Sequence, residues 1–286
     1  MTENIYTDYK KTSGNLYIVA TPIGNLRDIT LRAVDTLKDV DFIAAEDTRV
    51  TIKLLNHLSI KKPMISCYRH NEPDRINTIV DRILLGENCA LCCDAGTPAI
   101  SDPGQLLVSK AIDMGIRIIP IPGPSAVISA LSSSGLDSGR FCFEGFIPMN
   151  KKTRRNRLIA LQNEQRTMVF YEAPHKLRRT LIDLRDYLGD REIVIARELT
   201  KIYEEFLYIT LSEAISLYSE HEPRGEFVVI VKGLEVTKEA EVSIEEAVLI
   251  AQNYMKNGLS TSEAAKKAAL ETNWPRSQIY KEVVGS

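Results

Sequence analysis

The sequence lacks the two glycine-rich signatures with which many α/β proteins hold nucleotides. No Gly-x-Gly-x-x-Gly opens its first strand and helix, where Thr21-Pro22-Ile23-Gly24-Asn25 stands instead, and no P-loop occurs. A ligand of this chain must therefore be held by a different loop geometry.

Long apolar runs are also missing. The 286 residues contain no stretch of about eighteen apolar residues, the length that begins to suggest a membrane-spanning helix. The polar start, residues 1–13, lacks the apolar core of a secretory signal peptide. We therefore expect no membrane contact and a cytoplasmic location.

An excess of charge of one sign is absent. Lysine and arginine total 36, and aspartate and glutamate total 38, which gives a formal net charge of -2. The overall charge therefore predicts no polyanionic partner, so nucleic-acid binding would need a local basic patch.

Cysteine is scarce, and its pattern argues against a metal site. Of the five cysteines, Cys89, Cys92 and Cys93 stand in one apolar run, where small thiols are expected to fill core space in a reducing compartment. The other two are Cys67 and Cys142. No second cysteine pair or histidine lies at ligand spacing from Cys89 and Cys92, so we expect no bound metal.

What the first half does contain is a regular alternation of strands and helices. Apolar runs predict strands at residues 16–20, 42–45, 64–67, 89–93 and 116–121. Helices are expected at residues 29–37 and 51–58, after Pro73, from Pro103, and from Ser125 to about Ser133. Repeated strand–helix units predict a parallel sheet covered by helices.

The second half contains more strand. We expect strands at residues 141–146, 167–171, 192–197, 206–210 and 227–231, with helices at 152–162 and 174–188. Some antiparallel pairing is expected here, which makes the sheet mixed. The predicted organisation is an α/β domain over residues 14–134, a second α/β domain over 135–234, and a small helical extension over 235–286.

The loop of residues 94–104 is the most site-like segment. It follows a buried-looking strand, is rich in small and turn-forming residues, and ends in Asp102-Pro103, which predicts a capped helix start. Open α/β folds bind ligands at such carboxyl strand ends. Three further segments should gather at the same edge of the sheet: residues 17–26, 45–49 and 122–126.

Five segments together carry a superfamily resemblance: residues 17–26, 45–49, 94–104, 122–126 and 197–201. A resemblance to one branch of that superfamily is carried by residues 20–26, Glu46-Asp47-Thr48-Arg49, His70-Asn71-Glu72, Tyr171-Glu172-Ala173-Pro174-His175, and residues 197–201. The chain resembles the tetrapyrrole methylase superfamily, from about Asn15 to Gly233. That resemblance implies two α/β domains of the class III methyltransferase type with S-adenosylmethionine held between them. Within the superfamily the chain resembles the ribosomal RNA branch, which methylates the ribose 2′-hydroxyl of a cytidine in the decoding region of 16S ribosomal RNA.

The resemblance also implies the cofactor-binding residues. They are Pro22, Asp94, Ala95, Gly96, Thr97, Pro98, Ile100, Ser101 and Ser125 from the first domain, with Glu172 and Ala196 from the second. Many superfamily members have Gly-Asp-Pro where this chain has Gly96-Thr97-Pro98, a departure that fits the RNA branch better. Without the other segments, Gly96 and Pro98 could instead form only a plain tight turn.

A ribose hydroxyl is a poor nucleophile at neutral pH, so a base or cation should assist it. We hypothesise that Asp47 or Glu198 orients or deprotonates the hydroxyl and that Arg49 or Lys201 holds a phosphate. Each of these could instead form a structural ion pair. His70 could titrate in the working range, or it could only cap the following helix.

Local positive charge lies just after the sixth expected strand. Lys151, Lys152, Arg154, Arg155 and Arg157 are candidates for RNA binding, although such a run can also be a solvated helix face. The tail resembles a small helix-turn-helix, with Ser260 as a cap, which could contact RNA or be a structural cap. The expected partners are 16S ribosomal RNA within the small subunit and a second copy of the chain.

Two other functions stay open at this point. The same fold and cofactor could serve a methyltransferase that acts on a tetrapyrrole or another small acceptor. Such an acceptor would not need the basic run. An RNA-binding ribosome-assembly factor without catalysis is the non-enzyme alternative, and it would not bind S-adenosylmethionine.

Overall fold

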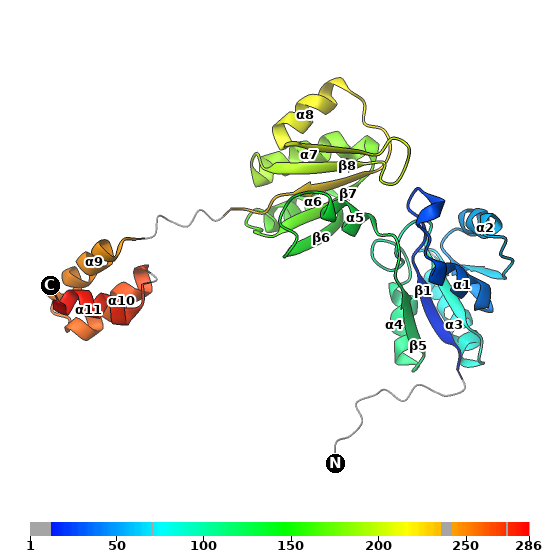
Figure 1. The fold of residues 1–286 in the computed structure, drawn as a ribbon, viewed down its shortest axis with the longest axis horizontal. Coiled ribbons are helices and arrows are strands. Elements are labelled where there is room, and N and C mark those ends of the chain that lie inside the picture. Colours follow the sequence, from blue (N-terminus) through cyan, green and yellow to red (C-terminus); the bar gives the residue numbers. More distant parts are fainter. Residues whose placement is uncertain (1–12, 70, 236–241, 273, 286) are drawn as a thin grey trace, which may run out of the picture. The chain divides into compact units, whose positions relative to one another are not determined.

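The computed structural model describes residues 13–69, 71–235, 242–272 and 274–285 (Figure 1). The contacts divide the chain into two compact units, of which the first ends at Gly233 and the second begins at Leu234. His70, one of the residues predicted to assist the reaction, lies outside the described residues. Among the described residues, no helix combines the length and the apolar character needed to cross a bilayer.

The first sheet has five parallel strands in the order β3-β2-β4-β1-β5. Every residue of the central strands β2 and β4 is buried, which explains why their sequences are continuously apolar. The predicted strands are confirmed to within one residue at each end: β1 (Asn15–Val19), β2 (Phe42–Ala45), β3 (Met64–Ser66), β4 (Cys89–Cys92) and β5 (Arg117–Ile121).

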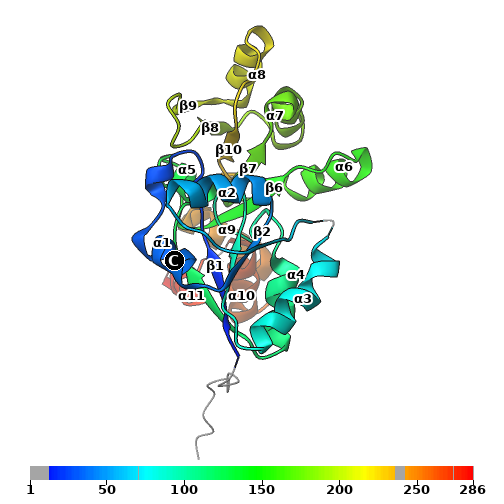
Figure 2. The same ribbon diagram turned by 90° about the vertical axis from the view of Figure 1, so that its right-hand side faces the viewer.

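Helices cover both faces of this sheet (Figure 2). On one face, α3 (Glu72–Leu84) and α4 (Gln105–Asp113) pack on Phe42 and Ala44 of β2. On the other face, α1 (Leu31–Asp39) and α2 (Thr48–His57) pack on Ile43 and Ala45. Alternate residues of β2 thus pack into the cores on opposite faces of the sheet, because successive side chains of a strand point to opposite faces. A short 3₁₀ turn, η1 (Leu26–Asp28), precedes α1.

The second sheet is mixed, as predicted. Its order is β6-β7-β10-β8-β9, in which β6 pairs with β7 in parallel and the other pairs are antiparallel. Its strands are β6 (Phe141–Phe146), β7 (Thr167–Glu172), β8 (Glu192–Arg197), β9 (Glu205–Thr210) and β10 (Phe227–Val231).

Three helices cover one face of the second sheet, namely α6 (Lys151–Ala160), α7 (Pro174–Leu188) and α8 (Leu211–Glu220). The sequence interpretation missed α8. The helix begins directly at the end of β9, where Thr210 and Glu213 form a capping box without an intervening loop. The opposite face is covered by α5 (Ala126–Ser132), whose Val127, Ala130 and Leu131 pack on β8 and β10.

Helix α5 follows the last strand of the first sheet in the chain, yet it packs on the second sheet. Both sheets belong to the unit that ends at Gly233. The division of that unit into domains at residues 134 and 135 stays a prediction.

The second unit contains α9 (Ile244–Lys256), α10 (Thr261–Thr272) and α11 (Arg276–Gly285). Alanines of α9 and α10 and Ile279 of α11 form its core. The Trp274 indole donates a hydrogen bond to the carbonyl of Val242 at 2.5 Å. The predicted cap is confirmed, because the Ser260 hydroxyl and Glu263 carboxylate bond each other and the backbone of α10's first turn.

Candidate active site

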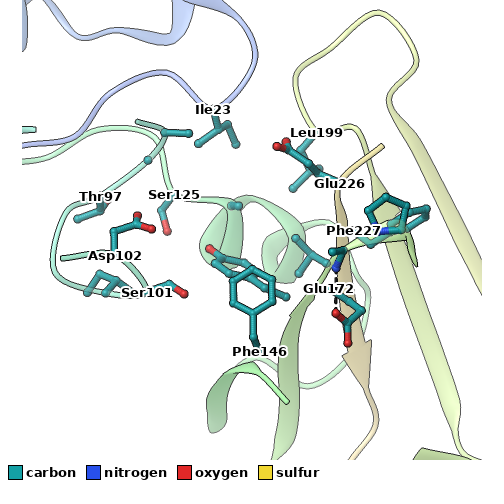
Figure 3. A pocket seen from close by; sticks show the side chains of 18 of the residues that line it. Ile23, Thr97, Ser101, Asp102, Ser125, Phe146, Glu172, Leu199, Glu226 and Phe227 are labelled. Carbon is teal, nitrogen blue, oxygen red and sulfur yellow. Dashed lines mark hydrogen bonds between the residues drawn. The ribbon is translucent and has the colours of Figure 1, made fainter. Parts of the chain in front are cut away.

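A cavity of about 530 Å³ lies between the two sheets of the first unit, within the roughly 300–1,000 Å³ range of small-molecule sites (Figure 3). The first sheet contributes the loop after β4 and the turn before α5. The second sheet contributes strand ends and the start of α7. The lining residues include Ile23, Ala95, Gly96, Thr97, Asp102, Ser125, Phe146, Tyr171, Glu172, His175, Leu199, Glu226 and Phe227.

The loop after β4 is fixed against the loop after β1. Thr21 and Gly96 exchange both backbone hydrogen bonds, at 2.8 and 3.0 Å, and the Thr21 hydroxyl donates to the Cys93 carbonyl at 3.1 Å. Thr97 donates its hydroxyl to the carbonyl of Pro124 at 3.1 Å. The predicted gathering of these strand-end loops is therefore confirmed.

Gly96 is required at this point of the cavity wall. Its φ of +86° is disfavoured for residues with a Cβ, and a Cβ there would lie 3.3 Å from Cγ2 of Ile23. The absence of a side chain leaves the backbone of the loop open toward the cavity.

The predicted helix start at Asp102-Pro103 is wrong. Helix α4 begins at Gln105, and its N-cap is Gly104, with a φ of +126°. The buried carboxylate of Glu72 accepts hydrogen bonds from the amides of Gly104 and Leu107, at 3.0 and 3.1 Å. Because Glu72 satisfies these amides, Asp102 is not a helix cap, and it lines the cavity instead (Figure 3).

Glu172 stands at the end of β7 in the opposite wall and is buried. One carboxylate oxygen accepts from the amide of Ala173 at 2.9 Å, and the other accepts from the Thr180 hydroxyl at 2.5 Å. Thr180 in turn accepts from Nη2 of Arg154 at 2.9 Å. A cavity-lining carboxylate is thus connected to the basic helix α6.

Most of the predicted cofactor-binding residues line this cavity. Those that do are Ala95, Gly96, Thr97, Ile100, Ser101, Ser125 and Glu172; Pro22, Asp94, Pro98 and Ala196 are not among its lining residues. The sequence interpretation missed Phe146 and Phe227, which form an apolar wall with Leu199 from the predicted segment of residues 197–201. Phe146 and Phe227 do stand at strand ends, but only the sheet order shows which ends of a mixed sheet meet.

Asp47 and Arg49 form an exposed ion pair rather than part of the cavity lining. Nη2 of Arg49 lies 2.7 Å from Oδ2 of Asp47, and the Arg49 side chain is 87% exposed. Hydrogen bonds from Arg49 lower the pKa of Asp47 to about 2, which makes this carboxylate a weak base.

Glu198 and Lys201 form a second ion pair. Lys201 Nζ lies 2.8 Å from a carboxylate oxygen of Glu198 and 2.8 Å from one of Glu226. The hydrogen bond from Lys201 lowers the pKa of Glu198. Proton transfer to Glu198 or to Asp47 would weaken an ion pair, so the geometry does not favour either as the base.

Two further carboxylates crowd the edge of the first sheet. The amide of Asp94 donates to Glu46 at 3.2 Å, and the amide of Asp47 donates to Asp94 at 3.1 Å. Burial raises the pKa of both Glu46 and Asp94. Negative charge therefore accumulates beside the loop that carries Asp102.

The basic run forms the first turns of α6, where Asn150 caps the helix. Lys151, Lys152 and Arg155 are exposed. Arg157 forms an ion pair with Glu144. The Arg154 side chain is only 4% exposed and pairs through Nε with Asp183 at 2.5 Å. Arg154 thus packs α6 on α7, and three cations remain most available for an external anion.

Comparison with known proteins identifies the relatives of this chain. A family model described as Tetrapyrrole (Corrin/Porphyrin) Methylases matches residues 15–215. The chain is 47% identical to Ribosomal RNA small subunit methyltransferase I of Synechocystis sp., covering 93% of this chain and 96% of the relative. It is 44% identical to the protein of that name from Bacillus subtilis, covering 95% and 94%.

Solved structures share the fold at low identity. Diphthine synthase superposes with a TM-score of 0.61 at 14% identity, covering 77% of this chain and 90% of its own. Uroporphyrin-III-C-methyltransferase of Thermus thermophilus has a TM-score of 0.54 at 16% identity, covering 76% and 94%. The chain therefore belongs to the tetrapyrrole methylase family and, within it, to the ribosomal RNA small subunit methyltransferase I family.

Proposed function

We propose that this protein transfers a methyl group from S-adenosylmethionine to the ribose 2′-hydroxyl of a cytidine in the decoding region of 16S ribosomal RNA. The observation that carries this function is the identity of 44–47% over almost the whole of two relatives named for methylating small-subunit ribosomal RNA. The cavity between the two sheets supports it with a site of suitable size.

The residues of the cavity fit this cofactor. Gly96 leaves backbone groups accessible where a side chain would obstruct them, and Leu199 and Phe227 provide apolar walls for a purine ring. Ser125 can donate a hydrogen bond, and the carboxylate Glu172 suits a ligand with cationic groups. When bound, the cofactor supplies an activated methyl group on a sulfonium.

The protein's own contribution is alignment and exclusion of water. The apolar wall from the second sheet, including Phe146, shields the reacting atoms, and the loop of residues 94–104 fixes the donor side of the cavity. We assign phosphate binding to Lys151, Lys152 and Arg155, which begin five residues after Phe146 in the chain.

The proposed activity can be tested with the purified protein and small ribosomal subunits from cells that lack the enzyme. With methyl-labelled S-adenosylmethionine, the label should appear in 2′-O-methylcytidine after digestion of the RNA to nucleosides. Label on a base would contradict ribose methylation. Label on an added tetrapyrrole, with none on RNA, would support the small-acceptor function instead.

Replacing Lys151, Lys152 and Arg155 together by glutamine should weaken binding to small subunits without changing cofactor affinity. The slope of log K against log salt concentration should become shallower by about two, because up to three phosphate contacts are lost. Binding titrations at several salt concentrations measure this slope.

The control for that variant carries the same change of charge at a distant place. Lys38, Lys61 and Lys110 lie toward the amino-terminal edge of the first sheet, away from the cavity. Their triple glutamine variant should keep the wild-type slope. Equal slopes for both triple variants would show that α6 does not bind RNA.

The proposed assembly is a homodimer in the cytoplasm, acting on the small subunit. The family resemblance is its support. Light scattering on the purified protein should give twice the chain mass of 32.1 kDa, and a single chain mass would exclude the dimer.

A further inference from the structure

Asp102 is a cavity-lining carboxylate with no ion-pair partner among the described lysines and arginines. Three acidic residues line the cavity: Asp102, Glu172 and Glu226. Both oxygens of Glu172 accept hydrogen bonds, and Glu226 forms an ion pair with Lys201. Within the described ranges, no lysine or arginine forms an ion pair with Asp102, and the helix that follows is capped by Glu72 instead.

The surroundings of Asp102 suit a proton acceptor. Figure 3 shows Asp102 on the same side of the cavity as the hydroxyl-bearing residues Thr97, Ser101 and Ser125. Burial raises the pKa of Asp102, while a hydrogen bond from the Cys93 thiol and the charge of Arg69 act in the opposite direction. A higher pKa strengthens a carboxylate as a base.

The other groups near Asp102 are less suited to accept a proton. Burial raises the pKa of Tyr171 to about 12, so its phenol is already protonated. Burial also raises the pKa of the Cys93 thiol far above neutrality. Glu46 and Asp94, whose pKa values the charge of Asp102 helps to raise, do not line the cavity.

His175 is the remaining competitor, since it lines the cavity and histidine is a common general base. It is exposed and stands in the first turn of α7, which begins at Pro174. Asp102 is instead half-buried, on the loop of the first sheet that also lines the cavity.

We propose that Asp102 is the catalytic residue that accepts the proton of the ribose 2′-hydroxyl, an inference that rests on the function proposed above. The hydroxyl oxygen forms a bond to the methyl carbon while the carbon–sulfur bond breaks, and the electron pair of that bond remains on sulfur. The hydroxyl proton passes to a carboxylate oxygen of Asp102 and then to water. Atoms and charge balance without a further reactant.

The test is Asp102→Asn, which keeps the size of the side chain and removes its basicity. At saturating cofactor and small subunits, kcat should fall at least about 100-fold. Calorimetry should give an S-adenosylmethionine affinity within about threefold of wild type, and the melting temperature should not fall. In the wild type, kcat should rise with pH through the raised pKa of Asp102, and the variant should lack this rise.

Two further variants make the result specific. Asp113→Asn makes the same chemical change at the far end of α4 and should keep wild-type kcat. His175→Gln should keep the rise of kcat with pH. The inference is overturned if D102N retains kcat within about threefold, if it loses cofactor affinity while kcat is unchanged, or if H175Q alone removes the rise. Failure of the wild type to methylate the 2′-hydroxyl would instead refute the proposed function.

Discussion

Replacing Gly96 by valine should reduce the affinity for S-adenosylmethionine at least about 100-fold, equivalent to about 2.8 kcal/mol. The residue has a φ of +86°, and even a Cβ would lie 3.3 Å from Cγ2 of Ile23. The two γ-carbons of valine would occupy cavity space, and the strained backbone would disturb the hydrogen bonds exchanged with Thr21. Calorimetric titration with the cofactor measures the loss.

Gly115 provides the matched control, because its φ is also positive, at +73°, and a Cβ there would have nothing within 4 Å. Gly115→Val should cost stability through the same kind of backbone strain, about 1–3 kcal/mol, yet keep cofactor affinity. If Gly96→Val bound the cofactor as tightly as wild type, the cavity could not be the cofactor site.

Replacing Arg154 by methionine should lower the free energy of unfolding by about 3 kcal/mol. Its buried guanidinium pairs with Asp183 and donates to Thr180, so removing it leaves Asp183 without its main partner. The Thr180 hydroxyl, which donates a hydrogen bond to Glu172 in the cavity wall, should also lose the hydrogen bond that it accepts from Arg154. Urea denaturation measures the stability.

Arg155→Met is the control for that change, since Arg155 is the exposed neighbour on the same helix. It should alter stability by no more than about 0.5 kcal/mol and weaken RNA binding. If R154M instead kept wild-type stability but bound RNA weakly, Arg154 would belong to the RNA-binding surface.

The sheets could be predicted from the sequence because their strands are buried. Strands such as β2 and β10 are apolar throughout and end at clear turn residues. Helix α8 lacked such a boundary, since Thr210 both ends β9 and caps the helix. The misplaced start of α4 has a tertiary cause: the capping carboxylate belongs to Glu72, 32 residues earlier in the chain.

Half of the candidate site could be predicted for a simple geometric reason. Loops after parallel strands share one edge, so residues 94–104 and Ser125 could be assigned to one site before the fold was known. The second sheet is mixed, so the meeting of Phe146, Leu199 and Phe227 depended on the strand order. Likewise, a run of cations does not reveal that Arg154 faces inward, because α7 supplies its partners.

Mapping 2′-O-methylation on 16S ribosomal RNA from cells with and without this gene tests the proposed function most directly. Loss of a single 2′-O-methylcytidine in the decoding region is expected in the deleted strain. It should return with the wild-type gene and fail to return with the Gly96→Val variant. An unchanged methylation pattern in the deleted strain, with no duplicate enzyme in that cell, would contradict the assignment.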